Sequence, residues 1–199
     1  MLRISNLKFD LSVEISALPE LVAQFLGIDP DFKSFKIVKR AVDARSRTQA
    51  YFVYTIDVEI AAEKTVLAKR LAGVEAIIPE LPLSIPHIKA EAVRPLVVGS
   101  GPAGMFAALT LAKAGLRPIV IERGAEVSER QKIVKNFWTT RKLNPESNVQ
   151  FGEGGAGTFS DGKLMTGIKK DIYTAEVFHE FVSAGAPEDI LYVQKPHVG

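Results

Sequence analysis

The stretch "LVVGSGPAGMFAALTLAKAGLRPIVIERG", residues 96–124, decides the fold of the second half of this chain. A short apolar strand at 95–98 leads into a glycine-rich turn, and small apolar residues then follow at helical spacing. Gly115 ends that helix, and a second apolar strand follows at 118–121. This order predicts an α/β unit of strand, helix and parallel strand, which is the start of a Rossmann-like domain.

Three glycines and one acid give this unit the pattern of a dinucleotide site. Gly99 allows the tight turn, Gly101 lets the backbone approach a pyrophosphate, and Gly104 permits close contact between helix and strand. The helix N-terminus directs free N–H groups at the phosphates. Glu122 ends the second strand, where a carboxylate accepts hydrogen bonds from ribose hydroxyls. FAD and NAD both bind to such units, so the pattern leaves the cofactor open. The candidate cofactor-binding residues here are Gly99, Gly101, Pro102, Ala103, Gly104, Glu122 and Arg123.

The composition is that of a globular chain with one or two domains. It has 199 residues, 47% of them hydrophobic, and a net charge of +2 spread evenly along the sequence. The even charge gives no signal for a nucleic-acid or anionic-membrane partner. Without cysteine, and with three isolated histidines, the chain offers no disulfide and no expected metal site. The charged start "MLRISNLKFD" is unlike a signal peptide and predicts a cytoplasmic protein.

One apolar stretch is long enough to be compared with a membrane-spanning helix. Residues 95–112 carry no charge and approach the length of a membrane-spanning helix. Three glycines and Pro102 within them would break an isolated helix. A buried strand, a turn and a helix accommodate the same residues without that cost. We therefore expect no membrane association.

The first ninety residues alternate between strand and helix patterns. An apolar stripe predicts one helix that stops at Gly27: Leu18, Leu21, Val22, Phe25 and Leu26. Residues 50–60 alternate apolar and polar side chains, as a half-buried strand does. The predicted elements are a strand in 1–9, a helix in 18–26, a hairpin of 35–45 and 50–60, a helix in 63–72 and a strand in 74–80. Their order, βαββαβ, predicts a ferredoxin-like domain.

A proline-rich stretch follows, and we read it as the domain boundary. Pro79, Pro82 and Pro86 make residues 79–90 a stiff linker. The predicted domains are a ferredoxin-like α/β domain at 1–90, with the linker at its end, and an incomplete FAD/NAD(P)-binding Rossmann-like domain at 91–199.

Five basic residues gather on the expected hairpin: Lys36, Lys39, Arg40, Arg45 and Arg47. Small βαββαβ domains sometimes bind RNA on their sheets. Charges at a sheet edge also discourage aggregation between sheets, and no aromatic box of the RNA-recognition type is visible. We favour a solvated edge here, with an interaction or RNA-binding role as the alternative.

Further motifs carry a resemblance to a known family. "GSGPAG" followed by "ERG" resembles the ADP-binding unit of flavoproteins that have two dinucleotide-binding domains. Four more segments are "ERQKIVKNFW" at 129–138, "LNPES" at 143–147, "NVQFGEGGAGTFSDGKL" at 148–164 and "KPHVG" at 195–199. With them the whole chain resembles the bacterial uncharacterised FAD-dependent, or NAD(FAD)-utilising, dehydrogenases. That family places a small α/β module before the flavin domain, which accounts for a glycine motif in mid-chain.

The resemblance implies FAD as cofactor, with NAD(P)H as a candidate electron donor, and places a second glycine-rich loop beside the flavin. Glycines let the backbone approach a bulky ligand, and hydroxyls and a lysine offer donors. Arg130 is a candidate for a phosphate or ribose contact and Lys163 for the flavin pyrimidine edge, with exposed surface positions as the alternative. The candidates in the loop are Gly154, Gly155, Gly157, Thr158, Ser160, Asp161 and Lys163.

Members of that family continue well beyond the length of this chain. The resemblance therefore implies the amino-terminal portion of an FAD-dependent oxidoreductase, inactive alone, and a nicotinamide-dinucleotide module without flavin is the alternative. Substrate, catalytic residues and oligomeric state are not assigned. An incomplete sheet is expected to expose apolar residues at 95–98, at 118–121 and in a strand "ILYV" at 190–193. Phe137 and Trp138, at the end of a helix, are expected in the core.

Overall fold

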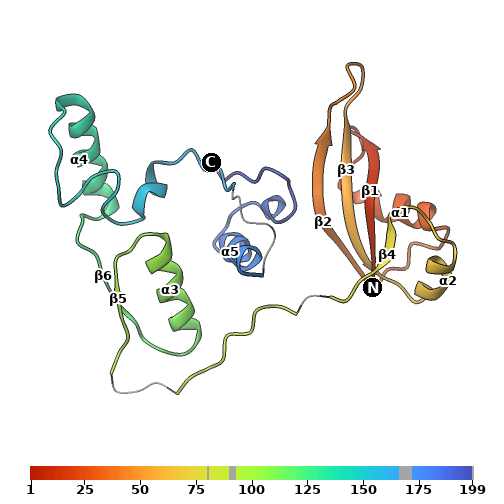
Figure 1. Cartoon of the computed structure of the whole chain (residues 1–199), viewed down its shortest axis with the longest axis horizontal. Coiled ribbons are helices and arrows are strands. Elements are labelled where there is room, and N and C mark those ends of the chain that lie inside the picture. Colours follow the sequence, from red (N-terminus) through yellow and green to blue (C-terminus); the bar gives the residue numbers. More distant parts are fainter. Residues whose placement is uncertain (80, 90–92, 166–171, 199) are drawn as a thin grey trace. The chain divides into compact units, whose positions relative to one another are not determined.

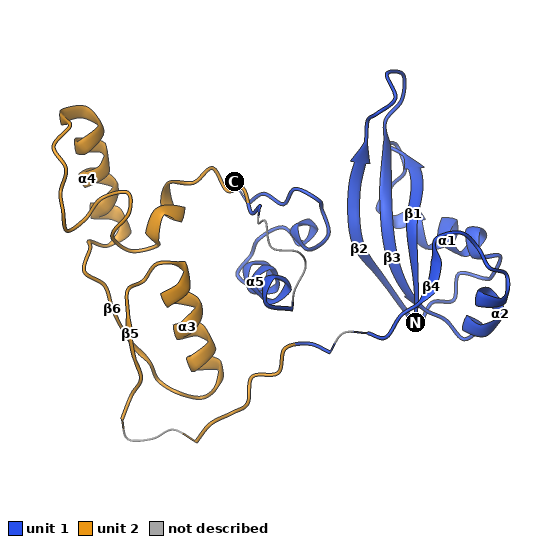
Figure 2. Ribbon diagram, viewed as in Figure 1, with its two compact units in different colours: residues 1–82, 164–198 blue, residues 83–163, 199 orange. Residues whose placement is uncertain are grey.

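The chain folds, in a computed structural model, as two compact units (Figure 2). One comprises residues 1–82 with 164–198, and the other residues 83–163. The fold is mixed α/β, with a four-stranded antiparallel sheet in the first unit and a two-stranded parallel sheet in the second. The residues that the structure describes are 1–79, 81–89, 93–165 and 172–198.

The first unit begins with the predicted order of strands and helices. Its elements are β1 (Leu2–Asp10), a 3-10 helix (Ile15–Ala17), α1 (Leu18–Leu26), β2 (Ser34–Asp43), β3 (Tyr51–Glu59), α2 (Glu63–Ala68) and β4 (Val74–Ala76). The strands lie in the order β2-β3-β1-β4, and every neighbouring pair is antiparallel. Both helices cover the same face of this sheet (Figure 1).

The alternation in β3 supplies the centre of the core, as predicted. Tyr54, Ile56 and Val58 are buried among the apolar side chains of α1 and α2. On the other face Asp57 is also buried, and its carboxylate accepts two hydrogen bonds of 2.8 Å from the guanidinium of Arg3, its partner on β1. The central strand pair is thereby joined by apolar packing on one face and by an ion pair on the other.

A bulge in β1 keeps its apolar residues on the core side. Leu2 and Ile4 precede an irregularity in the pairing with β3, and Leu7 follows it. Asn6 in the bulge has a left-handed backbone, with φ of 62°. The extra residue shifts the alternation by one position, so that all three apolar side chains are buried.

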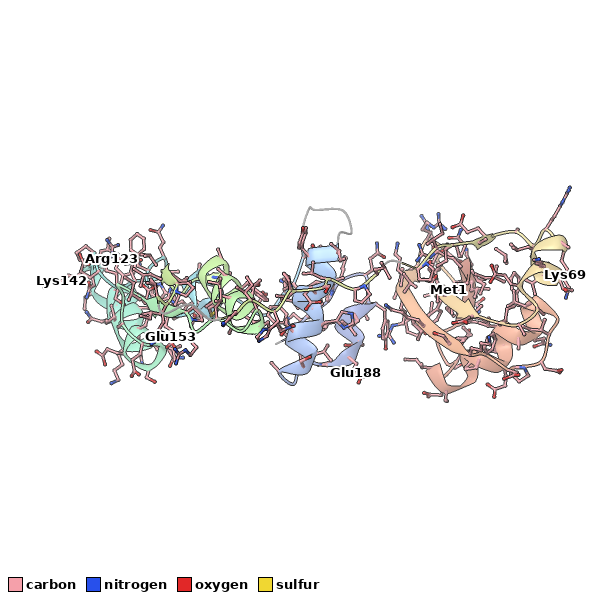
Figure 3. All side chains as sticks on the ribbon, turned by 90° about the horizontal axis from the view of Figure 1, so that it is seen from below. Met1, Lys69, Arg123, Lys142, Glu153 and Glu188 are labelled. Atoms are coloured by element: carbon pink, nitrogen blue, oxygen red, sulfur yellow. The ribbon has the colours of Figure 1, made fainter. Side chains whose placement is uncertain are left out.

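Helix α1 has the predicted stripe and the predicted end. Val22 and Leu26 are fully buried, and Gly27 ends the helix with a φ of 63°. The Nζ of Lys69, which is labelled in Figure 3, donates to the last carbonyl of the helix, that of Leu26, at 2.7 Å. Phe25, expected on the same face, is 41% exposed because it lies at the edge of the stripe.

The next two elements are shorter than predicted. α2 ends at Ala68 and not near 72, because Arg70 adopts a left-handed backbone with φ of 50°. β4 ends at Ala76, where its pairing with Leu2 of β1 ends. Of the residues expected in this strand, Glu80 lies outside the described residues.

The linker region carries no helix or strand in its described part. Residues 81–89 lack regular structure, and Glu80 and Ala90 lie outside the described residues. Residues 83–89 belong to the second unit, and one backbone hydrogen bond joins them to the end of α3 (Pro102–Lys113). The N–H of Ile88 donates to the carbonyl of Ala114 at 2.7 Å.

Residues 164–198 of the first unit contain α5 (Ile172–Ser183) and a 3-10 helix (Glu188–Leu191). The strand predicted at 190–193 is wrong. Pro187 and the two acids that follow it start a helical turn instead, and Ile190 is buried rather than exposed. Val193 forms a single parallel bridge with Arg40 at the edge strand β2. Gly199, the last residue of the "KPHVG" motif, lies outside the described residues.

The basic hairpin does not present all of its charges to solvent. The guanidinium of Arg40 lies 5.3 Å from the ring centre of Tyr192 and 3.4 Å from the carboxylate of Asp189. Arg45 donates two hydrogen bonds of 2.8 Å to the carboxylate of Asp43. Two of the five basic residues are therefore paired with acids, and the choice between a solvated edge and an RNA-binding surface stays a prediction.

The second unit contains the strand, helix and parallel strand that the sequence predicts. Its elements are β5 (Leu96–Val98), α3 (Pro102–Lys113), β6 (Ile119–Ile121), α4 (Val127–Thr140) and a 3-10 helix (Gly155–Phe159). β5 and β6 pair in parallel along their whole length, and Gly115 follows α3 with a φ of 86°.

This small sheet is open to solvent, as the sequence predicts for residues 95–98 and 118–121. Leu96 is 59% exposed, Val98 76% and Ile121 47%. The prediction that Trp138 lies in the core is wrong, because its ring meets Phe159 at one edge and 55% of the residue stays exposed. Among the described helices, none is long and apolar enough to cross a membrane.

Candidate functional site

The glycine turn joins β5 to α3 and is tied to the sheet. Gly99 has a left-handed backbone with φ of 97°, and its N–H donates to the carbonyl of Ile121 at the end of β6, at 2.7 Å. Gly101 is the N-cap of α3, which begins at Pro102. The first N–H groups of the helix therefore face the space beyond the ends of the two strands, where an anion is favoured.

The glycines of the turn differ in the space around them. A Cβ added at Gly104 would overlap the carbonyl oxygen of Gly99, so the missing side chain lets α3 pack against the turn. A Cβ added at Gly101 would have nothing within 4 Å. Gly104 thus serves packing, whereas Gly101 leaves the open space that a pyrophosphate contact requires.

Glu122 binds the turn from the end of β6. Its Oε2 accepts hydrogen bonds from the N–H of Ser100 at 2.7 Å and from the hydroxyl of Ser100 at 3.3 Å, and its Oε1 accepts from the N–H of Gly124 at 2.8 Å. These donors, the N–H of Ser100 first, lower the pKa of Glu122 below its ordinary value, against a smaller opposing effect of burial. An ionised carboxylate thus stands beside the open face of the turn.

We expect Glu122→Ala to weaken the binding of ADP. The loss of a charge-assisted hydrogen bond, about 1.5–3 kcal/mol, corresponds to roughly 10- to 100-fold in affinity. Since the folded pKa lies below the ordinary value of 4.5, the contribution of the carboxylate is complete above that pH and disappears as the pH falls through the folded pKa. Calorimetric titration with ADP at several pH values measures both effects. Glu122→Gln, which cannot titrate, is the matched control, and equal affinity of Glu122→Ala and wild type at neutral pH would contradict the ribose role.

The second glycine-rich loop, residues 152–158, packs against the glycine turn. The N–H of Gly154 donates to the carbonyl of Ser100 at 3.1 Å. A Cβ added at Gly155 would lie 2.9 Å from the Cδ of Pro102. The structure therefore brings the two predicted glycine motifs together at the N-terminal end of α3.

Arg130, on α4, is fully buried, so the exposed helix face considered for it is wrong. Its guanidinium lies 4.9 Å from the ring centre of Phe159. Burial lowers the pKa of Arg130, and the charge of Glu122 opposes that effect. The guanidinium donates four hydrogen bonds to protein oxygens: from Nε to the carbonyl of Asn148 (2.9 Å), from Nη2 to the carbonyl of Val149 (2.8 Å), and from Nη1 to the carbonyl of Glu153 (2.6 Å) and the hydroxyl of Thr158 (3.2 Å).

The candidates at the end of the second loop are exposed. The carboxylate of Asp161 and the ammonium of Lys163 form an ion pair at 2.8 Å, and both side chains are about two-thirds exposed. The hydroxyl of Ser160 accepts from the N–H of Gly162 at 3.1 Å. A Cβ added at Gly157 would have nothing within 4 Å. Contact of these residues with a flavin stays a prediction.

Two further candidates lie beside the first motif. The guanidinium of Arg123 lies 4.5 Å from the ring centre of Phe151 and 3.4 Å from the carboxylate of Glu146. Arg123 and Glu153, both labelled in Figure 3, belong to the segments that flank α4 in the sequence. Ala103 is exposed in the first turn of α3.

Three polar residues outside the predicted set support the site. The hydroxyl of Ser147 accepts from the N–H of Ala125 at 3.2 Å, and the side-chain oxygen of Asn148 accepts from the N–H of Gln150 at 2.8 Å. Serine and asparagine form such turns often, so "NPESN" carried a readable signal. The carboxylate of Glu153 accepts the N–H of Val127 at the start of α4, 2.8 Å away, and no local pattern indicates that contact.

The residues that the structure describes hold no group of three or more His, Asp or Glu side chains suited to a metal ion. The groups that the site offers to a ligand are backbone N–H groups, open glycine faces and the carboxylate of Glu122.

Comparisons with known proteins agree with this location. A model of an FAD binding domain matches residues 94–131, which contain β5, the glycine turn, α3, β6 and Arg130. A domain of unknown function (DUF8436) matches residues 1–59.

A protein of Clostridium beijerinckii, described as an uncharacterized protein, is 43% identical to this chain over 204 residues. The alignment covers 100% of this chain and 38% of the clostridial protein, so the chain spans less than half the length of that relative. At a coarse level the two comparisons support an FAD-dependent family, and the segment that matches an FAD binding domain is the one that forms the strand–turn–helix site.

Proposed function

We propose that this chain is the FAD-binding portion of an oxidoreductase. The observation that carries the proposal is the position of the FAD-domain match, which falls on a turn where an open glycine, a helix N-terminus and an ionised carboxylate meet. Gly101 and the first N–H groups of α3 would bind the pyrophosphate, and Glu122 would bind the adenosine ribose.

The residues present fit the ADP half of FAD. FAD, when bound, supplies hydride and electron transfer, and the protein binds and orients it. Gly99 and Gly101 leave the space that the ligand needs, while Gly104 keeps α3 against the turn. The second loop would close one side of this site through Gly154 and Gly155.

The finer fold assignments belong to the same proposal. The sheet order β2-β3-β1-β4, with β1 inserted between β3 and β4, supports a ferredoxin-like domain for residues 1–90. The parallel β5–α3–β6 unit supports the start of a Rossmann-like FAD domain within 91–199. The cytoplasmic location stays a prediction.

Oxidoreductase activity in a protein as long as the clostridial relative is a separate proposal. The comparisons give NAD(P)H no support as electron donor. A nicotinamide-dinucleotide module without flavin is the rival function, since the same glycine turn can bind either dinucleotide.

We expect a full-length protein that contains this chain to hold FAD without a covalent bond, because residues 96–124 have the pattern of an ADP-binding unit and the 199 residues offer no cysteine for a thioether link to the flavin. Heat or acid denaturation followed by chromatography of the supernatant measures this. FAD released in about equimolar amount supports the proposal. Flavin that stays with the precipitated protein would contradict the non-covalent attachment, and bound NAD without flavin would favour the rival function.

A further inference from the structure

Arg130 shows an unusual combination of burial and charge. The side chain is fully buried, although arginine is rarely so. Burying a cation costs free energy unless hydrogen bonds compensate for the lost hydration. Here the guanidinium contacts three backbone carbonyls and one hydroxyl, all supplied by residues 148–158.

The 148–158 loop, which includes the second glycine-rich loop, in turn surrounds the side chain of Arg130. A Cβ added at Gly152 would lie 2.5 Å from the Cδ and 2.8 Å from the Nε of Arg130. Gly152 has a φ of 126°, Gly154 of 82° and Gly155 of 61°, left-handed conformations that glycine adopts most readily. Without the arginine, the carbonyls of Asn148, Val149 and Glu153 would lack this donor and would turn toward water.

The same loop forms a wall of the dinucleotide site. Gly154 donates to Ser100, and Gly155 packs against Gly101 and Pro102, beside the open face of Gly101. A change in the loop conformation would therefore alter the surface beside Gly101, where the pyrophosphate is expected to bind. Four of the five N–H donors of Arg130 bind oxygens of residues 148–158, so we argue that the side chain acts on this place through the loop.

We propose that Arg130 is the positioning residue of the dinucleotide site: its buried guanidinium folds the 148–158 loop against the glycine turn, and the loop completes the surface that receives the pyrophosphate. The inference rests on the proposed function. The sequence suggested that Arg130 contacts a phosphate or ribose directly. In the present proposal Arg130 contacts the loop, and the loop contacts the ligand.

The experiment combines two measurements on the full chain. Hydrogen exchange by mass spectrometry reports the stability of the 148–158 loop, and saturation-transfer NMR with ADP as the probe reports affinity at low protein concentration. The variant Arg130→Ala removes the guanidinium, and free guanidinium at a low, non-denaturing concentration is then added back. Two variants on the same helix serve as controls. Lys132→Ala removes an exposed cation, and Val134→Ala removes buried apolar packing.

In Arg130→Ala we expect faster exchange of the loop amides and about tenfold weaker ADP binding or more, with both effects reversed by free guanidinium. Lys132→Ala should match wild type, and Val134→Ala should not respond to guanidinium, which separates positioning from general stability. Weaker ADP binding with unchanged loop exchange would overturn the inference in favour of direct contact. Faster exchange of the loop amides with unchanged ADP affinity would overturn this inference and leave the proposed function standing. Absence of ADP binding by wild type would overturn the proposed function and this inference together.

Discussion

Gly101→Val is expected to lose ADP binding by about 100-fold or more while the protein keeps its stability. The substitution places a branched side chain in the open space beside the helix N-terminus, where nothing else lies within 4 Å of the new Cβ. A pyrophosphate can then no longer approach the backbone. Loss of two hydrogen bonds to a charged group, roughly 1.5–3 kcal/mol each, exceeds 100-fold in affinity. Titration with ADP and a thermal unfolding curve measure the two quantities.

The matched variant is Gly104→Ala, three residues further along the chain in the first turn of α3. Its Cβ would overlap the carbonyl oxygen of Gly99, so β5 and α3 would have to separate, at a cost of about 3 kcal/mol or more. This smaller substitution should therefore unfold the second unit, whereas Gly101→Val should not. If Gly101→Val unfolds the unit, or leaves ADP affinity unchanged, the assignment of the open face to the ligand is wrong.

The second large effect concerns the unequal stability of the two units. In limited proteolysis of the 199-residue chain, we expect cuts within residues 83–163 well before any cut within residues 2–76. The first unit has a continuous core, which contains Ile4, Val22 and Ile56 among others. In the second unit both strands stay exposed, and several of its buried residues are polar. Local opening should therefore be far more frequent there, and the cleavage rate follows the population of the open form.

The same argument predicts that this chain alone binds FAD poorly or not at all and shows no turnover, since its parallel sheet is exposed to solvent. Sequencing the first proteolytic fragments checks where the chain is cut. The visible absorption spectrum of the purified chain checks whether FAD is bound. A yellow, monomeric preparation that resists protease would contradict both.

Much of the fold could be read from local patterns. The stripe that contains Val22 and Leu26, the alternation around Ile56 and the glycine turn each depend on residues close together in sequence, and the structure has all three. The bulge at Asn6 could not be predicted, because it depends on the register of β1 against a strand about fifty residues away. The turn after Pro187 was missed because "ILYV" alone has a strand pattern, although the acids before it favour a helical start.

The candidate site divides in the same way. Gly99, Gly104 and Glu122 belong to one strand–helix–strand unit, whose geometry follows from their spacing. The burial of Arg130 depends on a loop that returns from eighteen to twenty-eight residues further along the chain. Such a contact is decided by tertiary packing, and a helix pattern around Arg130 gives no sign of it.

The contacts of Glu153 fix the length of the chain around it. Its N–H donates to the carbonyl of Ala125, its carboxylate accepts from Val127, and its carbonyl accepts from Arg130. An engineer who inserts or deletes one residue between Asn148 and Thr158 would move these three contacts out of phase together. Tags and fluorescent labels belong instead in the exposed hairpin turn at 44–50, where the side-chain hydrogen bonds are short-range or lie on the surface.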